Sequence, residues 1–600
     1  MSLEEQVHID IDGFLLRVIY EDLRVEQVMS GHHRFSFLWR YTDTVMVDPS
    51  VHGKMQQDYL GTQVIFTFKS VTGIMLKSKG LINKLVTLDE QGSTEGLYVE
   101  GISHTAVLED VVRCRTFVNQ NLQDLVQGIL SEGPGEFFHR EVIAPTITTR
   151  FPWLIQYNET NFEFLTRLAA RYGQWFYFDG MRMQFGVTKP SKIVLLNSST
   201  LHEFRIETQL TSHKVSLGGY DYRTATNVRA ALARTSEGSG DGYAKAVGQR
   251  QGGMAQHELK YGTYTSQPLD QGTIDEMAKI QTAGNDANGV FYSGISYIPL
   301  GIGQTFTIQN QKIEHHLLVI ESTHISESHG NYACKFKAIP ADVRAPHYTN
   351  VHAYARAEKQ LGSVIKNDDP EGLGRVRVAF NWTSGLNETD WIRMKQPHGG
   401  AGKGFYFIPE KGEEVQIEFE GNNADMPYVS GTHYNGKDSS GYSTAGNDQK
   451  VIHTRSGTKI IFNDAQKSVF IEDPSGNTWL MDGAGNISVN APKNFTVNAG
   501  ENVNITAGKN VTISAGDDMD NSAGKNITQV AGNDLSQSAA GEIIENSDKR
   551  TEIVEKDFKR QADTSNEIAS EVYIFSQKEN MTLQSGKTVE INSAEKSKMF

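Results

Sequence analysis

The residues best suited to chemistry in this chain are two adjacent histidine pairs and one acidic segment. The pairs are His32-His33 and His315-His316, and imidazole serves as a general base or a metal ligand near neutral pH. Neighbouring residues on a strand point to opposite faces, so neither pair is expected to converge on one ion. The acidic segment, Asp368 to Gly372, has the composition of a calcium loop. Its ligand spacing is wrong for calcium, and we expect a turn between strands instead.

The motifs that define common enzymes are missing from the sequence. It contains no Gly-x-Ser-x-Gly, His-Glu-x-x-His, Cys-x-x-Cys or phosphate-binding loop. The last histidine is His453, so no imidazole is available to bind a metal in the residues that follow it. We therefore expect a protein that is not an enzyme, with no catalytic residue, no metal and no cofactor.

Composition narrows the possible classes further. The chain has 600 residues, enough for several domains, and its net charge of −15 disfavours non-specific binding to nucleic acid. Two cysteines, Cys114 and Cys334, make no disulfide framework and fit the reducing cytoplasm. The first 12 residues resemble no signal peptide, and no run of 18 apolar residues spans a bilayer. If the protein leaves the cell, we expect an apparatus to carry it.

A repeat of eight residues dominates the C-terminal part of the chain. Ala-Gly pairs recur at this period from Ala499-Gly500 to Ala531-Gly532. Apolar and polar residues alternate within each octad, which predicts a short strand with one buried face. A glycine in each repeat predicts a corner, where the chain turns with positive φ or packs its backbone tightly. The predicted corner glycines are Gly500, Gly508, Gly516, Gly524, Gly532 and Gly586.

One octad cannot bury its own apolar face. Its apolar side chains contribute roughly 4–6 kcal/mol on burial, whereas ordering eight residues costs about 8–16 kcal/mol in backbone entropy. We therefore predict that three chains wind together into an intertwined β-helix, a triangular prism to which each chain supplies one wall. A single-chain β-solenoid and a disordered Asn/Gly/Ser tract are the alternatives. The predicted prism interior comprises Phe495, Val497, Val503, Ile505, Val511, Ile513, Met519, Ile527, Leu535, Phe575, Met581, Leu583, Val589 and Ile591.

The apolar pattern is interrupted in the middle of the repeat. Asn521 and Gln529 occupy positions predicted to face inward, and charged residues dominate from Glu542 to Glu571. When the pattern returns at Tyr573 and Phe575, its phase has moved by two residues, which predicts an irregularity or a loop. The inward polar groups are compatible with either bound water or bound ions.

The sequence before the octads predicts three further features. Residues 1–358 are expected to form a mixed hub domain, mainly β, with two β-rich subdomains. Alternating apolar residues on both sides of an Asp-Gly pair in Val7–Val18 predict a hairpin. Thr160 and Glu163 form a capping box at the start of a helix, and the aromatic run Trp175–Phe178 then predicts a buried strand.

Residues 359–445 predict a small closed barrel. Five short alternating strands separated by Gly and Pro turns are typical of an OB fold. Residues 446–600 are expected to form a needle, in which a few strands lead into the octads. The fold class predicted for the whole chain is therefore mainly β and multidomain.

These segments carry a resemblance to one family. The barrel, with Gly374-Arg375-Val376-Arg377-Val378 and Pro409-x-x-Gly412-x-Glu414-Val415, resembles the barrel of the VgrG family, the spike proteins of type VI secretion systems. The segment Trp153–Asp179 resembles the hub of that family. The octads resemble its needle, and likewise the needle of contractile phage tails.

The resemblance implies a structural spike that punctures a target and delivers effectors. It implies a homotrimer whose hubs form a ring docked on a tube of stacked hexameric rings. Further expected partners are a cone protein that caps the needle tip and effector or adaptor proteins carried on the spike, with transient passage through a target membrane and no nucleic acid. Met599 and Phe600 are the predicted contact with the tip protein, and a frayed terminus is the alternative. The spike is expected in the cytoplasm before firing, and then outside the cell or in a target cell.

Three other functions are alternatives for this sequence. The baseplate hub or tail spike of a phage or related contractile particle fits the same features. A cell-wall hydrolase would need an enzyme domain, yet only about 55 residues separate Asn435 from Ala491, and the repeat continues to Ile591. An adhesin is expected to end in a globular head, whereas this chain ends in repeats.

Overall fold

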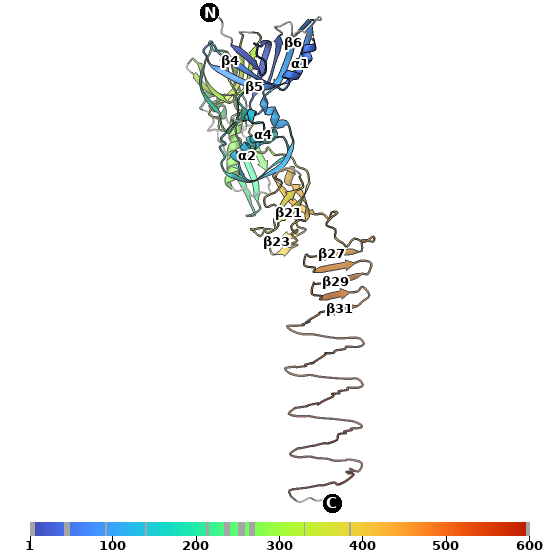
Figure 1. The fold of residues 1–600 in the computed structure, drawn as a ribbon. Coiled ribbons are helices and arrows are strands. Elements are labelled where there is room, and N and C mark those ends of the chain that lie inside the picture. Colours follow the sequence, from blue (N-terminus) through green and yellow to red (C-terminus); the bar gives the residue numbers. More distant parts are fainter. Residues whose placement is uncertain are drawn as a thin grey trace. The chain divides into compact units, whose positions relative to one another are not determined.

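The chain is mainly β and divides into two compact units, Met1–Pro492 and Lys493–Phe600 (Figure 1). The computed structural model describes residues 6–40, 49–90, 93–138, 141–209, 211, 215–232, 240–249, 259–262, 271–311, 313–328, 331–382 and 386–595. All helices and strands found among these residues belong to the first unit. The predicted fold class, mainly β with several sheets, is confirmed.

A 12-stranded sheet forms most of the hub. One half runs in the order β1-β4-β5-β6-β3-β2, and the other continues as β19-β20-β17-β13, with β18 pairing with both β19 and β12. The halves join where β2 pairs antiparallel with β19. The strands are β1 (Val7–Ile11), β2 (Ile19–Val28), β3 (Arg34–Arg40), β4 (Gln63–Lys69), β5 (Met75–Glu90), β6 (Ser93–Ile102), β12 (Lys189–Leu196), β13 (Leu201–Thr208), β17 (Val290–Ser296), β18 (Gln304–Asn310), β19 (Ile313–Ser326) and β20 (Ala333–Pro340).

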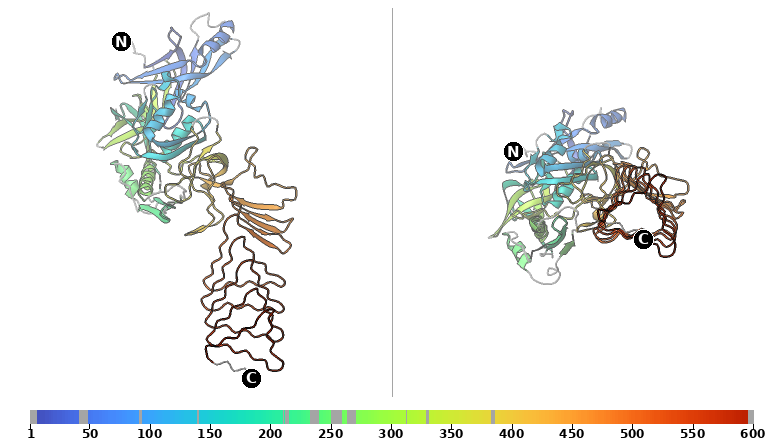
Figure 2. Two further views of the ribbon diagram at one scale, coloured as in Figure 1. Left: turned by 60° about the horizontal axis from the view of Figure 1, so that its bottom comes forward. Right: turned by 90° about the horizontal axis from the view of Figure 1, so that it is seen from below.

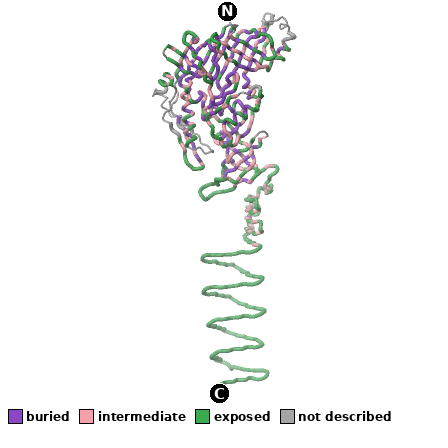
Figure 3. The backbone as a smooth tube through the Cα atoms, turned by 60° about the vertical axis from the view of Figure 1, so that its left-hand side comes forward, coloured by how far each residue is buried: buried purple, intermediate pink, exposed green. Residues whose placement is uncertain are grey.

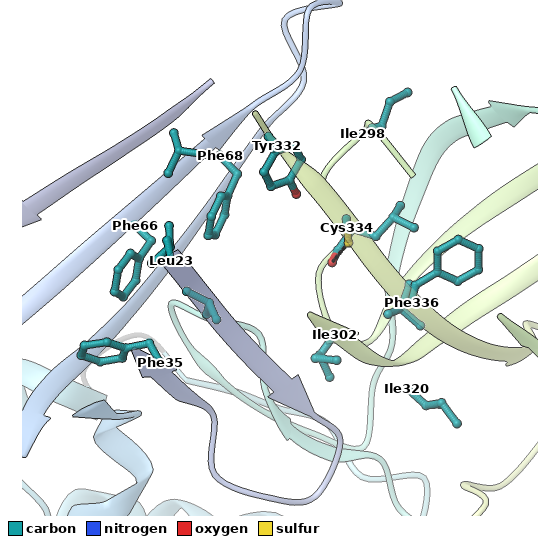
Figure 4. Close-up of a cluster of buried hydrophobic side chains, with 14 of the residues drawn as sticks. Leu23, Phe35, Phe66, Phe68, Ile298, Ile302, Ile320, Tyr332, Cys334 and Phe336 are labelled. Carbon is teal, nitrogen blue, oxygen red and sulfur yellow. Dashed lines mark hydrogen bonds between the residues drawn. The ribbon is translucent and has the colours of Figure 1, made fainter. Parts of the chain in front are cut away.

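The two halves of this sheet share one apolar core. Figure 4 labels side chains of this core from the first half (Leu23, Phe35, Phe66, Phe68) and from the second (Ile320, Tyr332, Cys334, Phe336). The ring of Phe68 stacks on that of His324, with 4.3 Å between centroids. Burial lowers the pKa of His324 to about 3, so this ring is neutral at physiological pH and packs as part of the core.

The predicted hairpin within Val7–Val18 is wrong. The Asp-Gly turn does form, because the Phe14 N–H donates to the Ile11 carbonyl at 3.0 Å and Gly13 has a φ of 79°. The following residues do not fold back on β1, which pairs with β4 instead. Phe14 packs edge-on against Trp39, with 4.7 Å between ring centroids. This tertiary contact outweighs the local alternation of apolar residues.

A helical layer follows the first half of the sheet. Thr160 caps α4 as predicted: its Oγ1 accepts from the Glu163 N–H at 3.1 Å, and the Glu163 carboxylate accepts from the Thr160 N–H at 2.8 Å. The aromatic run is a buried strand, β10, as predicted. The elements here are η2 (His104–Glu109), β7 (Arg113–Asn121), α2 (Leu122–Ser131), α3 (Gly135–Phe138), β8 (Val142–Ile143), β9 (Arg150–Glu159), α4 (Asn161–Arg171), β10 (Phe176–Phe178) and β11 (Met183–Phe185).

A smaller sheet in the hub has the order β15-β14-β16 and packs on α6. Val215 and Leu217 of β14 share a core with Ile274 and Ala278 of α6. The elements are β14 (Val215–Asp221), β15 (Thr226–Leu232), β16 (Leu259–Gly262) and α6 (Gln271–Asp286); α1 (Pro49–Tyr59) and α5 (Gly242–Gln249) lie elsewhere in the hub.

The OB domain has four regular strands in the order β22-β21-β25-β26, one fewer than predicted. Residues 391–394, one of the segments on which the barrel prediction rests, form only single bridges. One joins Ile392 to Val376 beside β22, and the other joins Met394 to Val429 in β26. The segment therefore contacts both edges of the sheet without becoming a regular strand. The elements are β21 (Gln360–Lys366), β22 (Arg377–Phe380), β23 (Gly399–Gly400), β24 (Lys403–Gly404), β25 (Glu414–Phe419), η4 (Glu420–Asn422) and β26 (Pro427–Thr432).

An antiparallel five-stranded sheet follows the OB domain. Its strands are β27 (Gln449–His453), β28 (Lys459–Asn463), β29 (Ser468–Glu472), β30 (Thr478–Met481) and β31 (Ile487–Asn490), paired in chain order. We call it the lead-in sheet. Within the part of the chain that the structure describes, no helix is long and apolar enough to cross a membrane.

The capping box of α4 can be tested by substitution. Thr160→Ala removes an N-cap acceptor and should cost about 1 kcal/mol of local stability. Hydrogen exchange of the first-turn amides of α4 should therefore become about fivefold faster. Thr166→Ala is the control, because the Thr166 hydroxyl in the same helix has no hydrogen-bond partner among the described residues. Equal exchange rates in the two variants would contradict the assigned cap.

Candidate assembly interface

Residues 493–595, called the octad tail below, follow a regular path without internal pairing. The backbone is extended between bends and winds as an open coil whose successive turns stand apart (Figure 1; Figure 2). Among these residues no backbone-to-backbone hydrogen bond and no paired strand occur within the chain. An extended backbone whose N–H and C=O groups lack partners is the edge of an unfinished sheet.

The predicted interior side chains of the octad tail are exposed in the single chain. Their exposed fractions run from 51% for Val589 to 83% for Phe575, and Figure 3 shows the whole tail as exposed. A regular row of apolar side chains this open to water is typical of an assembly interface. Which of them face the interior of a trimer stays a prediction.

The corner glycines lie at bends, but not for the conformational reason predicted. Each of the six predicted corner glycines begins a bend of the backbone. None of them has a positive φ, and a Cβ added at any of them would meet no atom within 4 Å in the single chain. The expectation of positive φ is therefore wrong. The other reason given for a glycine, close packing of backbone, can act only through another chain.

The phase shift in the middle of the tail is an irregularity and not a loop. Bends fall at residues 548, 555–556, 563, 570, 577–579, 586–587 and 594–595. The six repeats between Asp548 and Ala594 thus take 46 residues, whereas six octads would take 48. Shorter repeats absorb the two missing residues, and the coil continues without an excursion.

Both faces of the lead-in sheet carry apolar side chains: the row Val451, Ile461, Phe470 and Leu480 lies on one face, and the opposite face, called its apolar face below, carries two such rows. Cross-strand pairing places Ile452, Ile460, Ile471, Trp479 and Val489 in one row. A second row on the same face contains Phe462, Val469, Met481 and Ile487. Trp479 is 47% exposed and Ile487 is 65% exposed. The sequence analysis predicted these strands but not the shared face, because the face depends on the register of all five strands.

The histidine pairs point apart and form no common site. His315 is buried and its Nδ1 lies 2.7 Å from the Asp241 carboxylate, whereas the neighbouring His316 is exposed on the other face of β19. His32 contacts Glu109 through Nε2 at 3.1 Å, and burial lowers the pKa of His33 to about 3. Within the described ranges, no three His, Cys, Asp or Glu side chains are grouped in a way that could hold a metal ion.

The acidic segment is a turn, as predicted, and the carboxylate of Asp369 accepts hydrogen bonds from neighbouring residues of the same segment. The Asp369 carboxylate accepts from the Leu373 and Arg375 N–H groups at 2.9 and 3.1 Å. The Arg375 guanidinium adds a bond of 2.7 Å from Nη2, and both side chains are almost fully buried. Burial would raise the pKa of Asp369, but the hydrogen bonds from Arg375 and the backbone lower it to about 2. Sequence reasoning missed Arg375 as the partner.

Two family models match the chain. The Phage tail baseplate hub (GPD) matches residues 56–330, and the Type VI secretion system/phage-baseplate injector OB domain matches residues 360–434. The two matches span 350 of the 600 residues. The hub sheet and the OB domain therefore define the class of the protein: a baseplate hub joined to an injector barrel.

Individual relatives narrow this class. The chain is 31% identical over 116 residues to Type VI secretion system spike protein VgrG1b of Pseudomonas aeruginosa, which is 18% of this chain and 15% of that protein. It is 29% identical over 112 residues, 10% of that protein and 18% of this chain, to Actin cross-linking toxin VgrG1 of Vibrio cholerae. The match thus spans less than a fifth of these curated relatives. The chain belongs to the VgrG family of type VI secretion spike proteins.

A solved structure supports the fold over a longer stretch. A chain of the Francisella PdpA-VgrG complex, half-lidded, covers 81% of this chain and 88% of its own length with a TM-score of 0.51. The identity is only 9%, so the likeness concerns the fold alone. The predicted tip contact, Met599 and Phe600, lies outside the described residues.

The corner glycines can be tested through the assembled protein. Gly508→Val should lower the melting temperature by several degrees if a neighbouring chain packs against the corner, because the single chain itself has room for the side chain. Thr512→Val, which adds no bulk at a bend, serves as the control. Scanning calorimetry that finds the two variants equally stable would contradict tight packing at this corner.

The pKa of Asp369 predicts how its contribution to stability depends on pH. A carboxyl group with a lowered pKa in the folded state stabilises the fold above its unfolded pKa of about 3.9 and loses that contribution as the pH falls. The difference in melting temperature between wild type and Asp369→Asn should therefore be constant from pH 7 to about pH 5. It should shrink between about pH 4 and pH 2. Asp368→Asn, at an exposed neighbouring position, should show no such loss.

Proposed function

We propose that this protein is the homotrimeric puncturing spike of a type VI secretion apparatus. One observation carries the proposal: the octad tail is regular and extended, yet among residues 493–595 no backbone N–H donates to a backbone carbonyl of the same chain. Copies of the same chain present the same spacing of donors, acceptors and apolar side chains. Intertwined copies can therefore complete its sheets and cover its apolar row.

The open coil supports closure by several chains over closure by one. A single-chain solenoid pairs each turn with the next, whereas the turns of this coil stand apart and every described residue in them is exposed (Figure 1). The space between turns is where the strands of two other chains would lie. The apolar face of the lead-in sheet supports the same arrangement, because three such faces can cover one another around an axis.

The role of the spike is mechanical. Contraction of a sheath supplies the work, and the trimer supplies a stiff needle, a hub that docks on a tube of stacked rings, and a platform for cargo. The hub and injector family matches describe structural parts, and this supports a chain that is not itself an enzyme. A cone protein at the needle tip and effector or adaptor proteins are the further partners that the proposal includes.

Export by the apparatus accounts for the expected location. The spike waits in the cytoplasm and is then driven out of the cell or across a target membrane. The polar positions in the middle of the octad tail, Asn521 and Gln529, would line part of the prism with water or ions. A phage baseplate role remains the second candidate, because the family model that matches the hub is that of a phage tail. Secretion of the protein that depends on type VI genes in the same genome would decide between the two.

Charge placed inside the prism should prevent assembly. Ile505→Asp would bury three carboxylates in each trimer, and each buried ion costs several kcal/mol. Light scattering coupled to size exclusion should show a trimer for wild type and single chains or aggregates for the variant. Asn504→Asp is the matched control, since the adjacent position faces outward by alternation and the added charge is the same. A stable trimer of Ile505→Asp would contradict the inward assignment of this residue.

A further inference from the structure

The tip of the hairpin between β14 and β15 touches the OB domain. Tyr222 lies in this tip, and its hydroxyl is 3.4 Å from Nη1 of Arg375. The next residue, Arg223, is 3.4 Å from the carboxylate of Glu371. The hairpin belongs to the small hub sheet that packs on α6, so this contact joins two parts of the chain that are about 150 residues apart.

A second arginine of the OB domain approaches the same tyrosine. The guanidinium of Arg393 lies over the ring of Tyr222, 5.1 Å from its centroid. A cation over an aromatic face at this distance is attracted by the ring electrons. Tyr222 therefore contacts the OB domain in two ways, by its hydroxyl with Arg375 and by its ring with Arg393.

The side chain of Arg375 is also held in place by contacts other than the one with Tyr222. Nε and Nη2 of Arg375 bind the carboxylate of Asp369, and its side chain is only 2% exposed. Nη1 is thereby directed at Tyr222. A guanidinium held as a planar fork loses little further freedom when it makes one more hydrogen bond.

The hub holds the OB domain at another place, built from different elements. Trp153 and Ile155 of β9 lie in the core of the OB domain, and Trp153 Nε1 donates to the Glu388 carbonyl at 3.0 Å. Arg171 of α4 binds Asp425 at 3.1 Å. The β14–β15 hairpin adds an attachment from a further element of the hub, which restricts rocking of the OB domain about these contacts.

We propose that the β14–β15 hairpin is a strut that locks the OB domain to the hub, with Tyr222 as its positioning residue. The proposal rests on the proposed function in one respect: in a puncturing spike, the strut would keep thrust from bending the joint between hub and OB domain. The contact itself does not depend on that function.

The rigidity of the joint can be measured by energy transfer between two dyes. Cysteines introduced at Lys192 in the hub and Lys411 in the OB domain, both exposed, would carry the dyes in full-length protein with Cys114→Ser. Cys334 is fully buried and out of reach of the labels. Labelled chain diluted with unlabelled chain before assembly gives distances within one protomer.

Tyr222→Ala should broaden the single-molecule distribution of transfer efficiency at least twofold. Arg393→Ala should broaden it as well, while leaving the pair of Arg375 and Asp369 intact. Arg393→Lys keeps a cation over the ring and should restore most of the wild-type width. Tyr220→Ala, on the same hairpin and without a hydrogen bond or ring contact to the OB domain among the described residues, should match wild type.

The outcomes separate this proposal from the proposed function. A wild-type width in both Tyr222→Ala and Arg393→Ala would overturn the strut. A wild-type protein that stays a single chain would overturn the trimeric spike. The width of the transfer-efficiency distribution could still be measured in that single chain, so the strut would be tested independently. Broadening in both variants with restoration by Arg393→Lys would support the strut, because a general loss of stability would not be reversed by a lysine.

Discussion

The central constraint on this structure is that the backbone N–H and C=O groups of the octad tail do not pair with one another within the chain. Throughout the described part of the octad tail, extended segments alternate with bends, and no N–H finds a carbonyl of the same chain. The large apolar side chains in the same segments are half exposed or more. The unpaired backbone groups and the exposed apolar side chains recur together along the chain, so one kind of partner can pair the first and cover the second. A further copy of the chain is the partner that matches them repeat by repeat.

The first unit shows the opposite condition, since its parts are joined by shared cores and paired strands. The β2–β19 pairing merges two halves of the hub into one sheet, and Trp153 of β9 extends the core of the OB domain into the hub. This continuity suits the proposed role, in which the hub passes force to a needle. In the proposed trimer, the octad tail would obtain the same continuity by pairing with other copies.

Local signals in the sequence predicted the local elements well. The capping box of α4, the buried strand β10 and the turn at Asp369 follow from a few neighbouring residues, and each is present. The octads were also visible, because their period is short and constant. Predictions failed where distant residues decide the outcome. The predicted Val7–Val18 hairpin does not form, and Phe14 packs against Trp39 instead.

The candidate interface was predictable in outline but not in its geometry. The apolar face of the lead-in sheet depends on the register of five strands, which no single strand reveals. A positive φ was one of the two reasons predicted for the corner glycines, and their φ values contradict it. The other reason, close packing of backbone, would depend on a neighbouring chain, which the single chain does not show. The residues that Asp369 and Tyr222 contact could not be predicted, because each lies across a turn or loop from its partner. The length of such a segment does not show which side chains meet.

The repeat of the octad tail has a consequence for the dimensions of a three-chain prism. In a three-chain prism each octad occupies one wall, and neighbouring strands on a wall are about 4.7–4.9 Å apart. One octad therefore advances the tip by about one strand spacing, whatever its sequence. The length of such a needle would be a whole number of repeats multiplied by this spacing. Duplication or loss of octads in the gene would change the length in fixed steps and leave both ends unchanged.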